Sequence, residues 1–307
     1  PLMLGNICQQ LYTMVDTMVV GQVAGVEALA ALGAVDFLMW VVTGISTGLT
    51  QGFSIQLSQY YGAKDFENLR KSLAHSYRLT AFIAAGVLIL SQSFASLVLT
   101  GLHTPSNIIR MSLLYLRIIF CGIPATAAYN MFASALRAMG NSKTPLTAMI
   151  IASVLNVSLD ILFVAGFGWG VAGAAIATVI AQSFSAVYCF LILRRIDIVH
   201  LTRADFMPAS GMNARLMKLG IPVVFQNIII GVGGLVVQYV INGYGFLFVA
   251  GFTATNKLYG LLEMAAISYG YAIVTYVGQN LGAEKIDRIR KGVRSSMLLS
   301  LLTSLII

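Results

Sequence analysis

The sequence predicts an all-α membrane protein, and three observations support this prediction. Of its 307 residues, 58% are hydrophobic and only 10% are charged, and the mean hydropathy is +0.85. A soluble domain of this length could not hide so much apolar surface, so the solvent must be a bilayer. The apolar residues also fall into runs long enough to cross about 30 Å of hydrocarbon. The third observation is an internal repeat, which divides the chain into two halves.

The apolar runs predict nine membrane-spanning helices, with boundaries known to within several residues. In chain order they lie near residues 1–21, 28–57, 76–98, 108–136, 145–167, 170–193, 216–241, 248–278 and 293–307. The first residue is proline rather than methionine, and the last run is cut short. We therefore expect the sequence to be truncated at both ends, and no signal peptide can be judged from it.

Basic residues predict the orientation of these helices, because Lys and Arg in short loops stay cytoplasmic. The connections after the second, fourth, sixth and eighth helices hold or adjoin sixteen of the nineteen Lys and Arg residues. The N-terminus and these connections are therefore expected in the cytosol. No aromatic residues are interleaved with the basic ones, so we do not expect a nucleic-acid partner.

The repeat has an offset of 220 residues. The segment 58–63, SQYYGA, returns at 278–283 as GQNLGA, and the Arg-Lys pair at 70–71 returns at 290–291. Six helices separate the copies, so both halves have the same orientation, as in transporters built from parallel repeats. The pattern predicts two parallel six-helix lobes. The N-terminal lobe holds helices one to six in residues 1–194, a cytoplasmic linker covers 195–215, and residues 216–307 hold helices seven, eight and part of nine.

The fifth helix carries an acid and an amide on one face. Asn156 and Asp160 stand four residues apart, and Met149 and Ser153 extend the same face. An acid at bilayer depth costs at least ~2.5 kcal/mol, so a functional role is the default explanation and ion pairing is the rival. After the turn at 167–173, Thr178 on the sixth helix falls at the depth of Asp160, roughly 12 Å below the turn.

The first helix carries a similar stripe of Gly5, Gln9, Tyr12 and Asp16. Asp16 lies roughly 10 Å before the turn at 21–25, near the depth of Asp160. Helices one, five and six are therefore expected to contribute to one site. Desolvation and mutual repulsion disfavour two charges there, so at least one carboxyl group should hold a proton near neutral pH.

Three further charged residues in the apolar runs are ranked below this site. Asp36 lies at a similar depth to Arg117, so a structural ion pair between them is as plausible as a functional role. Lys257 and Glu263 on the eighth helix are six positions apart and do not share a face, so each is only a candidate for lining the cavity of the second half.

No motif in this sequence has the context that an enzymatic site requires. The pattern from Gly168 to Gly173 matches a dinucleotide fingerprint, but it follows a helix-length apolar run instead of a strand. The three histidines lie in or beside loops, and the three cysteines fall singly within apolar runs, without zinc spacing. We expect no enzyme and no cofactor.

Four motifs carry a resemblance to the multidrug and toxic compound extrusion (MATE) family. They are VDTMVVG at 15–21, RAMGNSKTP at 137–145, the Asn156 to Val164 segment and GQNLGA at 278–283. The resemblance covers the whole sequence and is strongest to the DinF-like branch. It implies twelve helices in two lobes and an antiporter that exports cationic or amphipathic compounds in exchange for protons or sodium ions.

The resemblance also implies roles for single residues. Its ion-coupling site, which would hold a proton or sodium, falls on Asp16, Asn156, Asp160, Thr178 and the backbone carbonyl of Ala174. Its substrate cavity falls on Gln9, Tyr12, Tyr115, Asn130, Met149 and Ser153, and its helix-bending proline on Pro1. The other main branch uses an acid on helix seven, where this chain has Ile230.

The sequence is therefore interpreted as a multi-pass, monomeric antiporter of the cytoplasmic membrane whose partners are a small-molecule substrate and lipid. Two alternatives remain. A lipid-linked oligosaccharide flippase of the same wider superfamily would need a strongly cationic cavity, whereas the expected cavity is lined by acids and amides. A non-transporting receptor or scaffold would tolerate neutral residues at Asp16 and Asp160.

Overall fold

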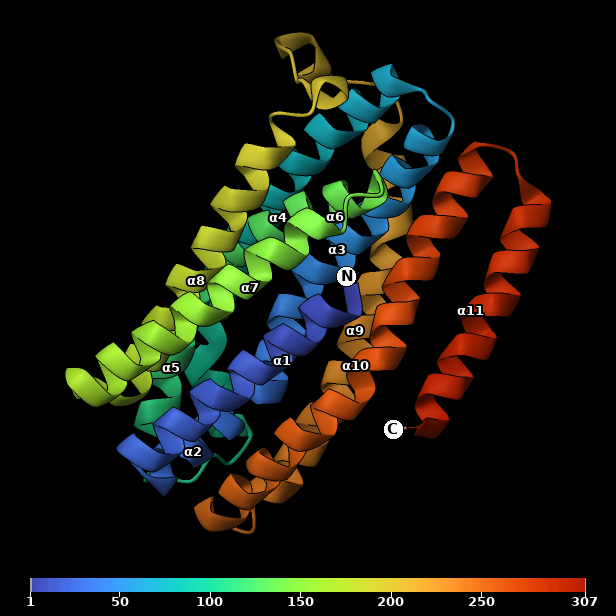
Figure 1. Cartoon of the computed structure of the whole chain (residues 1–307). Helices are drawn as coiled ribbons and strands as arrows, with labels where there is room; N and C mark the ends of the chain where they lie inside the picture. The colour runs from blue at the N-terminus through green and yellow to red at the C-terminus, as the bar shows by residue number, and fades with distance from the viewer. Residues whose placement is uncertain (1, 307) are drawn as a thin grey trace.

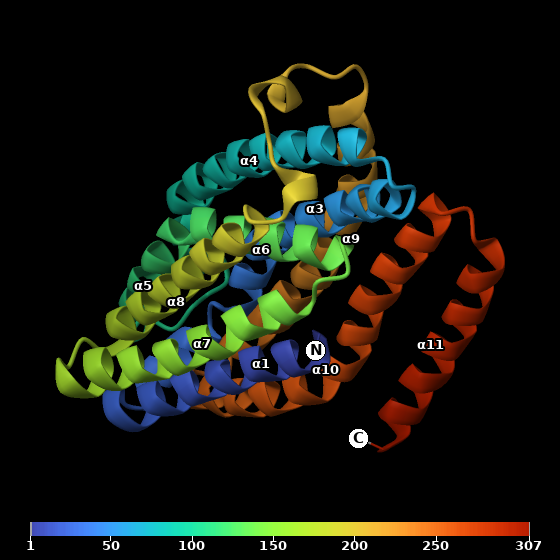
Figure 2. The same cartoon turned by 45° about the horizontal axis from the view of Figure 1, so that its top comes forward.

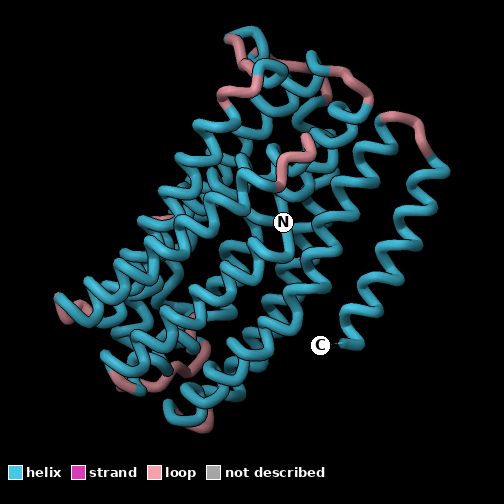
Figure 3. Tube along the Cα trace, in the orientation of Figure 1, coloured by secondary structure: helices cyan, strands magenta, loops and turns pink. Residues whose placement is uncertain are grey.

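The structure is a computed structural model that describes residues 2–306, apart from the side chains of residues 2, 261–266, 304 and 306. This part of the chain is a bundle of long helices and contains no strand (Figures 1 and 3). Pro1, the expected site of a helix bend, and the side chain of Glu263 lie outside the described residues. The expected all-α architecture is confirmed.

The first half of the chain contains eight α-helices and two π-helical turns. They are α1 (Leu2–Val19), η1 (Val20–Ala24), α2 (Val26–Gly33), α3 (Asp36–Gly62), α4 (Phe66–Gly101), α5 (Ile109–Cys121), α6 (Ile123–Ala138), α7 (Lys143–Asp160), η2 (Ile161–Gly166) and α8 (Gly170–Leu193). The short 3₁₀ turns η3 (Asp197–Val199) and η4 (Arg203–Phe206) follow. The second half contains α9 (Met212–Asn242), α10 (Phe246–Gly282) and α11 (Ile286–Ile306).

Each of the nine expected spans coincides with helix, although several are interrupted. The second is divided into α2 and α3, and the fourth into α5 and α6, which meet at Gly122 with a bend of 48°. The first and fifth end in the π-helical turns η1 and η2. Within the described residues, five spans are long and apolar enough to cross a membrane, or six when α5 and α6 count as one.

Successive spans run in opposite directions, so the loops gather at two faces (Figure 1). We call one the turn face, formed by residues 20–25, 102–108, 161–169 and 243–245. We call the other the basic face, formed by residues 63–65, 139–142, 194–211 and 283–285. Most of the Lys and Arg residues in the sequence lie at or near the basic face.

The backbone repeats at the same offset as the sequence. Gly25 before α2 and Gly245 before α10 have φ of +94° and +84°, values that favour glycine. Lys64 after α3 and Glu284 after α10 both have φ of +58°, a value that is uncommon for residues other than glycine. Both pairs are 220 residues apart, so the two halves share backbone geometry even where a lysine replaces a glutamate.

The two halves meet where α3 packs against α9 and α10. Small residues let α3 and α9 approach closely: a Cβ atom added to Gly52 would lie 2.3 Å from the Gly220 Cα. Two asparagines reach across this interface. Nδ2 of Asn227 in α9 donates to the Gly44 carbonyl, and Nδ2 of Asn6 in α1 donates to Ser268 Oγ in α10, both at 2.9 Å.

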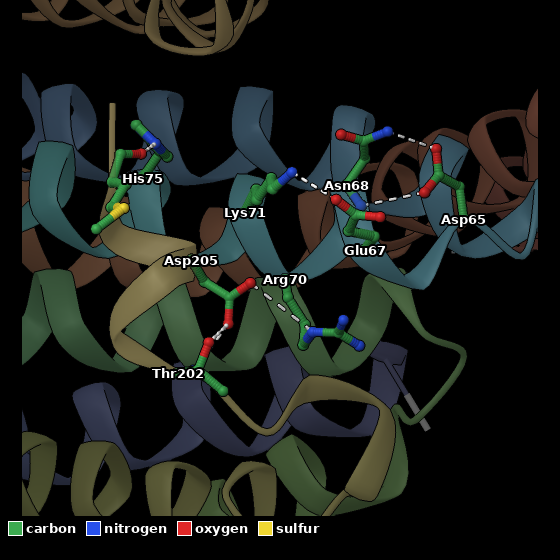
Figure 4. A network of polar contacts seen from close by, with 9 residues as sticks. Asp65, Glu67, Asn68, Arg70, Lys71, His75, Thr202 and Asp205 are labelled. Atoms are coloured by element: carbon green, nitrogen blue, oxygen red, sulfur yellow. Dashed lines mark hydrogen bonds and ion pairs between the residues drawn. The ribbon is translucent and has the colours of Figure 1, made fainter. Parts of the chain in front are cut away.

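The outermost helix, α11, packs on α10 at one edge of the bundle (Figures 1 and 2). The segment between the halves instead lies against α4 on the basic face, as Figure 4 shows. Asp205 accepts a 2.8 Å hydrogen bond from Thr202 Oγ1 and lies 3.8 Å from the Arg70 guanidinium. His75 Nδ1 lies 2.7 Å from Asn213 Oδ1. The connection therefore follows a defined path over the first half.

Candidate functional site

The candidate site lies between α1, α7 and α8, below the turn face. Asn156 and Asp160 stand one turn apart at the end of α7, and both are fully buried. Nδ2 of Asn156 donates a long hydrogen bond of 3.4 Å to Thr178 Oγ1 on α8. The structure therefore brings the amide and the hydroxyl together, as the antiparallel arrangement of the two helices predicts.

Asp16 joins this group from α1, which packs against α7. It is 4% exposed, and it lies close enough to Asp160 for their charges to interact. Four buried oxygens in this group have no hydrogen-bond partner in the described residues: Asp16 Oδ1, Asn156 Oδ1 and both carboxyl oxygens of Asp160. Buried polar atoms are normally satisfied, so these four oxygens are available to a proton, a cation or a water molecule.

The helices change geometry beside both acids. Asp160 is the last residue of α7 before η2, and Asp16 lies one turn before η1. The two π-helical turns contact one another. Single π-helical turns within α-helices occur frequently at functional sites, because they disturb the regular backbone hydrogen-bond pattern. The acids therefore lie where α1 and α7 depart from regular helix.

Two of the expected cavity residues adjoin the acids. Tyr12 accepts a 3.3 Å hydrogen bond at its hydroxyl from Gln182 Nε2 on α8. Tyr115 is 6% exposed and lies within electrostatic reach of Asp16 and Asp160. Sequence reasoning missed Gln182, although it lies four residues beyond Thr178 and thus on the same helix face. That spacing was the available signal.

The other expected residues are more dispersed. Asn130 on α6 donates from Nδ2 to Thr47 Oγ1 on α3 at 3.2 Å. Met149 is buried in the apolar cluster on the basic-face side, and Ser153 Oγ donates to the Met149 carbonyl. Gln9 is partly buried on α1, and Ala174 is fully buried in the same apolar cluster as Tyr115.

Asp36 forms an ion pair, but not with Arg117, the partner considered from the sequence. Nζ of Lys257 on α10 lies 3.0 Å from Asp36 Oδ1 and 2.8 Å from Oδ2, whereas Arg117 is exposed on α5. Equal depth in the membrane does not determine which face of a helix a side chain occupies. The sequence indicates Lys257 only as a candidate for lining the cavity of the second half, whereas its partner in the structure lies in the first half.

The sequence is similar to those of known proteins. The MatE family model matches residues 1–162 and 222–307. The probable multidrug resistance protein YpnP of Bacillus subtilis is 31% identical over 289 residues, covering 94% of this chain, and YoeA of the same species is 28% identical over 302 residues, covering 96%. The chain spans 65% of the length of each relative.

A solved structure of a multidrug resistance MATE family transporter, in its outward-facing conformation, has a similar fold. The TM-score is 0.90 at 22% identity, and the match covers 99% of this chain and 68% of that one. The family model matches most of the sequence, and one relative exceeds 30% identity over nearly all of it. The chain therefore belongs to the MatE family.

Proposed function

We propose that this chain acts in a secondary antiporter that exports organic, cationic or amphipathic compounds across the cytoplasmic membrane while a proton or sodium ion enters. The family and the multidrug-resistance names of its relatives support export. The observation that carries ion coupling is the cluster of four buried, unpartnered oxygens on Asp16, Asn156 and Asp160. A scaffold would have no use for such a cluster in a bilayer.

The charge balance around the site favours cation binding. Asp16 lies within electrostatic reach of both Asp36 and Asp160, and among the described residues Lys257 is the cation that acts on Asp16. Three ionised carboxylates against one ammonium group leave two negative charges uncompensated. A bound proton, sodium ion or cationic compound would reduce this charge, so these species compete for the site. Competition of this kind links the entry of one to the release of another.

The residue types suit either coupling ion. Protonation of Asp16 or Asp160 would remove a buried negative charge and turn one carboxyl oxygen into a hydrogen-bond donor. With both acids ionised, Asn156 Oδ1, Thr178 Oγ1 and the carbonyl of Ala174 would complete a set of hard oxygen ligands around sodium. One site therefore accounts for proton or sodium coupling without further cofactors.

The orientation of the protein is part of the proposal. The basic face lies in the cytosol together with the N-terminus, and the turn face lies outside. Single cysteines at Lys64 and Trp169, both exposed, report this in a background in which Cys8, Cys121 and Cys189 have been replaced. An impermeant thiol reagent added outside should label position 169 and not position 64, and the reverse pattern contradicts the orientation.

The decisive experiment measures efflux and equilibrium binding on the same purified proteins. Proteoliposomes carry pH and sodium gradients that are varied separately. Asp16→Asn and Asp160→Asn should each abolish gradient-driven efflux, while drug binding weakens by about 1–2 kcal/mol, the scale of one charge-assisted hydrogen bond. Asp287→Asn on the exposed surface of α11 is the matched control and should transport normally. Normal gradient-driven export by Asp160→Asn contradicts this role for the site.

A further inference from the structure

One ion pair joins the two halves of the chain beside the acid site. Asp36 is the first residue of α3, and Lys257 lies three turns into α10, 221 residues further along the chain. The Lys257 ammonium contacts both carboxylate oxygens of Asp36, at 3.0 Å and 2.8 Å. Asp36 lies eleven positions after the turn-face segment 20–25, and Lys257 lies twelve positions after the segment 243–245.

A second contact holds the backbone of α10 in place around Lys257. Nε2 of Gln10 on α1 donates to the Lys257 carbonyl at 3.1 Å. Gly260 allows this approach, since a Cβ atom there would lie 2.4 Å from the same Gln10 nitrogen. Three helices, α1, α3 and α10, therefore converge on Lys257, and the direction of its side chain is determined by the Asp36 carboxylate.

The charge of Lys257 also acts on the neighbouring site. Its ammonium lies within electrostatic reach of Asp16, and so does the Asp36 carboxylate. The Lys257 and Asp36 side chains are 16% and 21% exposed, so the protein does not fully enclose the pair.

The opposite end of the same interface is built differently. Near the basic face, α3 and α10 approach through glycines: a Cβ atom on Gly62 would lie 2.0 Å from the Gln279 carbonyl, and one on Gly282 would lie 1.9 Å from the Gln59 carbonyl. No ion pair occurs there among the described residues. Contacts between α3 and α10 are thus backbone packing at one end and a charge pair towards the other.

We propose that Asp36 and Lys257 are positioning residues for transport: their ion pair holds α10 against α3 beside the acid site and breaks each time the two halves separate at the turn face. The pair gives the second half a direct electrostatic link to the acids of the first. This inference rests on the proposed function for its place in transport, while the link itself is a property of the structure.

The test measures the separation of the halves directly. Spin labels are placed at Val26 and Leu247, at the starts of α2 and α10 beside the turn face. The native side chains at these positions are 47% and 66% exposed. The distance distribution between the labels is recorded in liposomes on a cysteine-free background. Asp36→Asn and Lys257→Gln should each increase the ratio of separated to closed molecules about tenfold, the effect of about 1.4 kcal/mol.

A double-mutant cycle shows whether Asp36 and Lys257 act through their ion pair or independently of each other. If the ion pair holds the halves together, the Asp36→Asn/Lys257→Gln double variant shifts the ratio of separated to closed molecules no further than either single variant. Shifts that multiply to about a hundredfold, or single variants that leave the ratio unchanged, overturn the proposal. Lys257→Arg retains the charge and should stay within about twofold of the wild type. If a neutral variant does not fold, this charge-retaining variant and the double variant still decide the outcome.

Efflux is measured on the same proteins so that the two proposals fail separately. If the distance between the labels varies as expected but the wild type shows no gradient-driven efflux, the proposed function is rejected and the role of the ion pair in holding the halves together stands. If efflux is normal but the Asp36 and Lys257 variants act independently, only the role of the ion pair is rejected. Arg117→Gln, which neutralises an exposed charge on the neighbouring helix α5, is the control and should change neither measurement.

Discussion

Asp36 and Asp160 are both carboxylic acids placed well inside the helix bundle, and their surroundings are opposite. Asp36 is 21% exposed at its side chain and has an ammonium group within 3.0 Å of both oxygens. Asp160 is fully buried, and neither of its oxygens has a hydrogen-bond partner among the described residues. The more exposed acid has the strong partner, and the more buried one has none.

This difference separates two uses of an acid in a membrane. A paired carboxylate is held as a permanent charge, and it is expensive to remove one partner because the other is left uncompensated. An unpaired buried carboxylate is poorly stabilised as an anion, so it readily accepts a proton or a cation. In the proposed function, the acid at the interface between the halves serves cohesion, and the acids between α1, α7 and α8 serve exchange.

The largest expected effect comes from breaking the pair. Lys257→Met leaves Asp36 uncompensated and should lower the free energy of unfolding by about 3 kcal/mol. Asp160→Asn removes a buried charge that has no partner, so stability should be unchanged or higher. Unfolding by SDS in mixed micelles, followed by circular dichroism, measures both. Equal losses in the two variants would show that the acids do not differ in the way described here.

The next effect concerns how tightly the halves pack. Gly52→Ala puts a methyl group against the Gly220 backbone and should cost about 2 kcal/mol, because neither helix can give way without moving the interface. Gly86→Ala on the exposed side of α4 meets no atom within 4 Å and should be neutral or stabilising by up to about 1 kcal/mol. A tolerated alanine at Gly52 would mean that the interface is looser than the backbone distances indicate.

A smaller effect is expected inside the candidate site. Thr178→Val removes the acceptor of the Asn156 amide while keeping the side-chain shape, and should cost about 1 kcal/mol, since the bond is long at 3.4 Å. Thr178→Ser keeps the hydroxyl and should stay within about 0.5 kcal/mol of the wild type. The same SDS titration measures this difference. A larger loss in the serine variant than in valine would point to packing of the methyl group instead of the hydrogen bond.

The smallest effect tests the choice of partner for Asp36. Arg117 is exposed, so Arg117→Gln should change the free energy of unfolding by less than about 0.5 kcal/mol. The measurement is paired with Lys257→Met in one experiment. If the arginine variant loses as much stability as the lysine variant, Asp36 is compensated by Arg117 in the membrane.

Helix periodicity and the position of one turn were enough to predict most of the candidate site. Asn156 and Asp160 share a face because they are one helical turn apart, and Thr178 meets Asn156 because a short turn joins two antiparallel helices. The nine spans likewise follow from apolar runs of sufficient length. These relations depend on neighbours in sequence, so helix geometry alone determines them. The roles of these residues in coupling stay predictions.

The contacts between the halves could not be derived in this way. Asp36 and Lys257 are 221 residues apart, and their meeting depends on how α10 docks on α3 and on which side each side chain points. Depth alone offers Arg117 as a partner, because it lies at a similar depth, but its side chain is exposed on α5 and does not meet Asp36. The close approach of Gly52 to Gly220 has the same origin, because it is set by the packing of two helices far apart in the chain.

The crossed asparagines have a consequence for the symmetry of the molecule. Asn6 in α1 donates into the second half, to α10, and Asn227 in α9 donates into the first half, to α3. The two residues are 221 positions apart, one out of step with the repeat. The interface therefore carries similar contacts in both directions, as expected for parallel repeats related by an axis along the membrane normal. The acids do not follow this symmetry, because the position 220 residues after Asp16 is Val236.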